Sequence, residues 1–180
     1  MGFGKTFSLS LVAFIALNFI FSILYLALGP GFDELLNRFN PSSPQYAPLM
    51  IIYYLFGAIA SVPSILLNWV IILPIFPPNI LDFLIIGLGF LIAPLIAAIL
   101  AGKFAESKLQ GFAGWVLTAV ISTIALVICI ILSPTFEATM TSTYGWSGFE
   151  LILISLAISC VVNIIFYGFF ALLVSKTEYY

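Results

Sequence analysis

The chain has 180 residues, of which 63% are hydrophobic and only 7% are charged, and its net charge is −2. Soluble domains average about 25% charged residues, so this composition excludes a water-soluble surface. It also offers no basic region for nucleic acid or for anionic lipid headgroups. The sequence therefore predicts an integral membrane protein that forms a single polytopic transmembrane domain over 1–180, with no soluble domain.

Five apolar segments are candidates for membrane helices, because about 20 apolar residues cross the hydrocarbon core of a bilayer. They lie at roughly 6–28, 47–76, 80–102, 112–132 and 150–174. We expect an all-α bundle of these 5 apolar helical segments. The connections between them carry the turn residues and nearly all the charge, and we expect 133–148 to be an extramembrane loop.

The connection between the first two segments contains a short amphipathic pattern. Its apolar residues are spaced as one face of a helix, at Phe32, Leu35, Leu36 and Phe39. Pro30 can begin such a helix, and Asn40-Pro41 ends it. We predict an interfacial amphipathic helix at about 31–39.

The second segment has two interpretations, because FGAIASVPSILLNW (56–69) carries polar residues and a proline. A straight helix over 47–76 would be about 45 Å long, against a core of about 30 Å. A kink with Pro63 as hinge absorbs the excess, whereas a re-entrant segment needs a protein-buried tip. We favour a kinked crossing and keep, as the alternative, four spanning helices plus a re-entrant segment at 47–76. Pro94 is a second candidate hinge, in the third segment.

The basic residues do not decide between these topologies. Five crossings place Arg38, Lys103, Lys108 and Lys176 in the cytoplasm and Lys5 outside. With a re-entrant segment, Lys5 and Arg38 exchange sides, so both topologies put four basic residues inside against one outside. Both also predict a cytoplasmic C-terminus and a multi-pass protein, but they differ in the side of the N-terminus.

Small residues recur at every fourth position of the third and fourth segments. This spacing lets helix backbones approach closely in lipid, where water supplies no driving force for association. We expect two helix-packing stripes, consisting of Gly89, Ala93, Ala97 and Ala101 in the third segment and of Gly114, Thr118, Ser122 and Ala125 in the fourth.

Polar side chains inside apolar segments are the first places to look for a functional site. The candidates for an intramembrane polar path are Asn18, Asn68, Ser155, Ser159 and Asn163. Two interpretations stay open. We favour hydrogen bonds between helices, on the order of 1 kcal/mol each, over the lining of a path for a solute.

No residue pattern predicts catalysis. The chain has no histidine, which excludes a Ser-His pair and an HExxH motif. Cys129 and Cys160 lack the spacing of a zinc site or a disulfide framework. We therefore expect no catalytic, cofactor-binding or metal-binding residues, and no enzyme.

Two functional hypotheses remain. The first is a structural or accessory subunit of a larger membrane complex or oligomer, whose partners are membrane lipid and other subunits or further copies of the chain. It is favoured by the packing stripes and by the scarcity of extramembrane sequence. The alternative is a small transporter or channel with a polar path near Asn18, Asn68 and Asn163.

Overall fold

The computed structural model describes residues 3–28, 32–43, 46–72, 80–145 and 148–175, and among these the regular secondary structure is entirely helical. Four helices are long and apolar enough to cross a membrane. They are α1 (Phe3–Leu28), α5 (Ile80–Lys103), α6 (Lys108–Leu132) and α8 (Phe149–Val174). The predicted all-α fold with apolar helices of membrane-spanning length is confirmed for these four segments.

Shorter helical elements connect the long ones. They are α2 (Phe32–Phe39), α3 (Met50–Phe56), the 3-10 turn η1 (Gly57–Ala60), α4 (Pro63–Leu67), the π-helical turn η2 (Asn68–Ile72) and α7 (Pro134–Tyr144). The first of these, α2, coincides with the amphipathic pattern of the sequence. Its Phe32, Leu36 and Phe39 are exposed, whereas Leu35 packs against the core.

The segment expected as a loop at 133–148 contains the helix α7, so that expectation is wrong in its secondary structure. The Ser133 hydroxyl caps the helix by accepting a hydrogen bond from the Phe136 amide. Pro134 occupies the first turn, where no amide donor is needed. Burial of Phe136 and Met140 holds α7 against the bundle.

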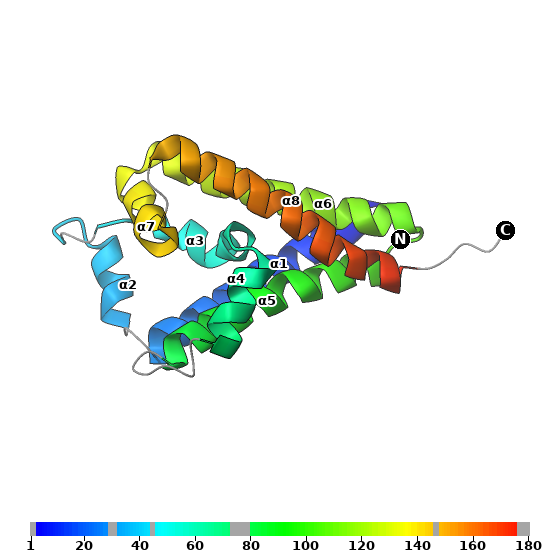
Figure 1. Cartoon of the computed structure of the whole chain (residues 1–180), viewed down its shortest axis with the longest axis horizontal. Helices are drawn as coiled ribbons and strands as arrows, with labels where there is room; N and C mark the ends of the chain where they lie inside the picture. The colour runs from blue at the N-terminus through cyan, green and yellow to red at the C-terminus, as the bar shows by residue number, and fades with distance from the viewer. Residues whose placement is uncertain (1–2, 29–31, 44–45, 73–79, 146–147, 176–180) are drawn as a thin grey trace.

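The four long helices alternate in direction (Figure 1). Thr6, near the start of α1, donates a hydrogen bond of 3.3 Å to the carbonyl of Phe104, just beyond α5. Gly89, closer to the start of α5, packs against Phe21, closer to the end of α1. These two contacts make α1 and α5 antiparallel. The start of α1 and the end of α8 lie at one end of the bundle, here called the terminal end, and the opposite end is called the distal end.

Glycines bring three helices together at the terminal end. A Cβ atom on Gly102 of α5 would collide with the carbonyl oxygen of Ala171 in α8. A Cβ on Gly111 of α6 would lie 2.5 Å from the Ser175 hydroxyl and 2.9 Å from the Gly102 Cα. Side chains larger than hydrogen are therefore excluded at these crossing points, as expected for close packing of helices in lipid.

At the distal end, the α1–α5 pair diverges from the α6–α8 pair, and α3 lies between them (Figure 1). The Tyr53 ring of α3 contacts the rings of Phe90 in α5 and Phe136 in α7, at centroid distances of 5.8 and 6.5 Å. The wedge between the two helix pairs is thus filled by a short helix of the chain's own second apolar segment.

The second apolar segment is bent far more sharply than the predicted kinked helix would be. Its two legs, Met50–Ala60 and Pro63–Ile71, meet at 98°. The cause is local: a residue before proline is driven out of the α region, and Val62 is extended at φ −83°, ψ 148°. Pro63 then begins α4, so the predicted hinge is a complete break. In contrast, α5 continues as a helix through Pro94.

The crowding at Gly102 generates a stability prediction. Gly102→Ala should lower the free energy of unfolding by about 1–3 kcal/mol, because the added methyl group overpacks the contact with α8. Gly4→Ala is the matched control, since its Cβ would meet nothing within 4 Å. It should leave stability unchanged or raise it by up to about 1 kcal/mol through helix propensity. Denaturant unfolding in detergent measures both, and equal effects would contradict the packing argument.

Candidate functional site

The break between η1 and α4 lies inside the bundle. Ile59, Ala60 and Ser61 are fully or almost fully buried. Because the break ends the helical hydrogen-bond pattern, it leaves carbonyls and amides that need partners elsewhere. An irregular backbone is tolerated at membrane depth only where protein or a water-filled cavity satisfies these groups. The side chains that do so define the candidate site.

Asn163 of α8 provides the main contact. Its Nδ2 donates to the carbonyl oxygens of Ile59, at 3.1 Å, and Ser61, at 3.0 Å. Both acceptors are carbonyls, which cannot donate, so the amide orientation is determined by chemistry. One asparagine thereby satisfies a carbonyl from η1 and a carbonyl from the extended residue that follows it.

Two α1 side chains hold the same segment from the other side. Asn18 Oδ1 accepts a hydrogen bond of 3.3 Å from the Ala58 amide, and its Nδ2 donates to the Phe14 carbonyl of its own helix. The Ser22 hydroxyl donates to the Tyr54 carbonyl at 3.3 Å. The name break seat is used below for Asn18, Ser22 and Asn163. All three are at most 1% exposed.

The five polar-path candidates of the sequence do not form one group. Asn18 and Asn163 meet on the same broken segment. Asn68 is exposed on η2, beyond the break. On α8, Ser159 is buried one turn before Asn163, and Ser155 is half-buried. A single path through Asn18, Asn68 and Asn163 is therefore not assembled by the described residues.

The packing-stripe candidates lie on the inner faces of their helices. Gly89, Ala93, Ala97, Ala101, Gly114, Thr118 and Ser122 are buried, and Ala125 is half-buried. The predicted stripes do not include a third one, on α1, which combines four polar residues with Phe14 and Leu26. Its buried members recur at every fourth position, at Thr6, Ser10, Phe14, Asn18, Ser22 and Leu26. This four-residue spacing is visible in the sequence and is the signal that predicts the stripe.

The α1 stripe faces α6 as well as the break. Thr118 Oγ1 and Ser10 Oγ are hydrogen-bonded at 3.0 Å. A Cβ on Gly114 would lie 3.1 Å from the Thr6 methyl group. The polar stripe of α1 thus contacts two neighbours: α6 toward the terminal end, and the broken segment near the middle of the bundle.

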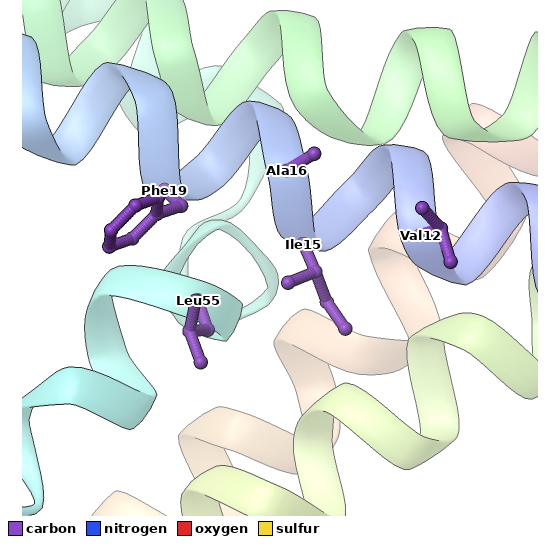
Figure 2. A pocket seen from close by; sticks show the side chains of 5 residues that line it. All are labelled: Val12, Ile15, Ala16, Phe19 and Leu55. Atoms are coloured by element: carbon purple, nitrogen blue, oxygen red, sulfur yellow. The ribbon is translucent and has the colours of Figure 1, made fainter.

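A separate groove lies on the outer surface between α1 and α3. It has a volume of about 270 Å³ and is lined only by apolar side chains, Val12, Ile15, Ala16, Phe19 and Leu55 (Figure 2). It presents no charged or polar group to a ligand.

The described part of the chain contains no group of three His, Cys, Asp or Glu residues arranged for a metal ion. Cys129 and Cys160 are buried free thiols. In comparisons with known proteins, no protein-family model, no curated protein and no solved structure matches this chain.

The break seat predicts unequal roles for two asparagines. Asn163→Leu should lower the free energy of unfolding by about 1–3 kcal/mol, because two buried carbonyls lose their donor. Asn68→Leu makes the same chemical change at an exposed position and should lower it by no more than about 0.5 kcal/mol. Unfolding of the purified variants in detergent compares them, and equal losses would contradict the assignment.

Proposed function

We propose that this chain is a non-catalytic multi-pass membrane protein that acts as a structural or accessory subunit of a larger membrane assembly. The break seat is the observation that carries this proposal. Asn18, Ser22 and Asn163 form hydrogen bonds with the chain's own backbone at the break and in the helix before it. Their hydrogen bonds serve architecture, which matches the interhelical role of polar residues in membrane proteins.

The outer face of α8 supports the same proposal. It carries large exposed apolar side chains at helical spacing from one end of the helix to the other: Leu151, Ile154, Ile158, Val161, Ile165, Phe169 and Leu173. A face of this length can pack against lipid or against a helix of a partner subunit.

We further propose that the four long helices cross the membrane and that 50–71 re-enters from the distal side. Because α1 and α5 are antiparallel, the chain leaves α1 and begins α5 at the same end. Tyr54 lies beside Ser22 of α1 before the break, and Val70 lies beside Gly87 of α5 after it. Both positions are displaced from the break toward the distal end, as expected for two legs of one hairpin.

Charge gives the orientation of this topology. Lys5, Lys103 and Lys108 belong to the terminal end, while Arg38 lies in α2 at the distal end. Lys176 is outside the described residues. By the positive-inside rule, the terminal end is cytoplasmic. The exposed Phe32, Leu36 and Phe39 side chains of α2 then lie at the outer interface, where an amphipathic helix is stable.

Two introduced cysteines test the topology independently of charge. The native Cys129 and Cys160 are first replaced by alanine. Ser42→Cys and Lys103→Cys should then react with a membrane-impermeant thiol reagent from opposite faces of oriented, sealed vesicles. A topology with five crossings places both positions on the same face, so labelling from one face would refute the re-entrant segment. Permeabilised vesicles, in which both cysteines should react, provide the control.

Gentle extraction followed by native mass spectrometry tests the proposed function. We expect masses in which this chain is bound to different polypeptides, or to further copies of itself in a defined assembly. A lone chain carrying only lipid would contradict a subunit role.

A small carrier or channel is the second candidate, because broken helices at mid-depth form solute sites in many transporters. Purified chain in liposomes should be impermeant to small solutes if the subunit proposal holds. Flux abolished by Ser159→Leu, beside Asn163, but retained in Asn68→Leu would instead favour a path along α8. Asn163 itself is unsuitable as this probe, since its loss weakens the fold.

A further inference from the structure

Two polar atoms on α8 have no hydrogen-bond partner among the described residues, Asn163 Oδ1 and the Tyr167 hydroxyl. Both residues are at most 1% exposed. A buried polar group without a partner costs about 1–3 kcal/mol, so such groups are rare in native proteins and each needs an explanation. The unpaired state of Oδ1 does not depend on an arbitrary amide assignment, because Nδ2 must face the Ile59 and Ser61 carbonyls.

Helix geometry and a shared neighbour bring the two residues together. Asn163 and Tyr167 are four residues apart and share a face of α8. Long side chains on a helix lean toward its N-terminus, which directs Tyr167 back over the turn that contains Asn163. Trp115 of α6 touches both residues: its Nε1 donates to the Asn163 carbonyl at 3.2 Å, and its ring lies 5.8 Å from that of Tyr167.

The chemistry of the site is complementary to one small molecule. Asn163 Oδ1 can only accept a hydrogen bond, whereas the Tyr167 hydroxyl can donate one. The Ile59 carbonyl accepts one bond from Asn163, and a backbone carbonyl can accept two. A molecule with two donors and an acceptor would therefore find about three partners, which is the number typical of a buried water.

We propose that the break contains a binding site for a single water molecule, held between Asn163 Oδ1, the Tyr167 hydroxyl and a carbonyl of the break. The water donates to Oδ1 and to the carbonyl, and it accepts from the tyrosine. It completes the break seat at mid-depth, where lipid offers no hydrogen bonds. This site is independent of whether the chain acts as a subunit or as a carrier.

Removing the Tyr167 hydroxyl should shift the thermal unfolding midpoint in opposite directions, depending on whether the water is bound. If the water is present, Tyr167→Phe removes one of its partners and should lower the thermal unfolding midpoint. If the hydroxyl is simply buried without a partner, Tyr167→Phe should raise the midpoint, because the desolvation penalty disappears. Tyr46→Phe, at an exposed tyrosine, is the matched control and should leave the midpoint unchanged.

Radiolytic oxidation of the wild-type protein gives a second readout that does not depend on stability. Hydroxyl radicals formed from a bound water oxidise the aromatic ring beside it, even when that ring is inaccessible from outside. Tyr167, at 1% exposure, should be oxidised several-fold more than Phe90 and Phe136, which are 0% exposed. Oxidation of Tyr167 at the level of these two rings, or a raised midpoint in Tyr167→Phe, would overturn the proposal.

Discussion

The structure depends on satisfying the backbone of a broken helix in the middle of an apolar bundle. At this depth there is no bulk water to take over the freed carbonyls and amides, so side chains must do it. Asn163 approaches from α8, while Asn18 and Ser22 approach from α1. Because these residues come from both helix pairs, the hydrogen bonds that stabilise the break also connect the two halves of the bundle.

The shape of the bundle follows from where small and large side chains lie. Glycines at 102 and 111 allow α5, α6 and α8 to meet at the terminal end, and the helices diverge from there (Figure 1). Divergence alone would leave a void between the pairs at the distal end. The aromatic and aliphatic residues of α3, with Tyr53 among the rings of α5 and α7, fill that space. The close packing of helices at the terminal end and the insertion of α3 at the distal end thus both follow from the divergence of the two helix pairs.

Much of the fold could be predicted from the sequence, and there are physical reasons why the other features could not. The long apolar segments and the four-residue stripes depend on local spacing, which the sequence displays directly. Pro63 indicates a hinge, but the sequence does not decide whether the segment crosses or re-enters, because both topologies explain the charges equally well. The proposed re-entrant segment rests instead on the direction of α5 relative to α1, which a tertiary contact between Thr6 and Phe104 reveals. The sequence predicts a loop where α7 forms, because Ser133 and Pro134 are residues typical of turns that also begin helices.

The polar residues show why a position inside an apolar segment is a weak guide to a side chain's role. Asn18, Asn68 and Asn163 have the same chemistry and lie in apolar sequence, yet Asn68 is exposed while the other two bind the break. An asparagine carries two donors and two acceptor sites on one group, which suits it to an irregular backbone that presents both kinds of atom. A carboxylate would be charged there, and a serine could not reach two carbonyls at once. The position of the break therefore selects asparagine on structural grounds, before any ligand is considered.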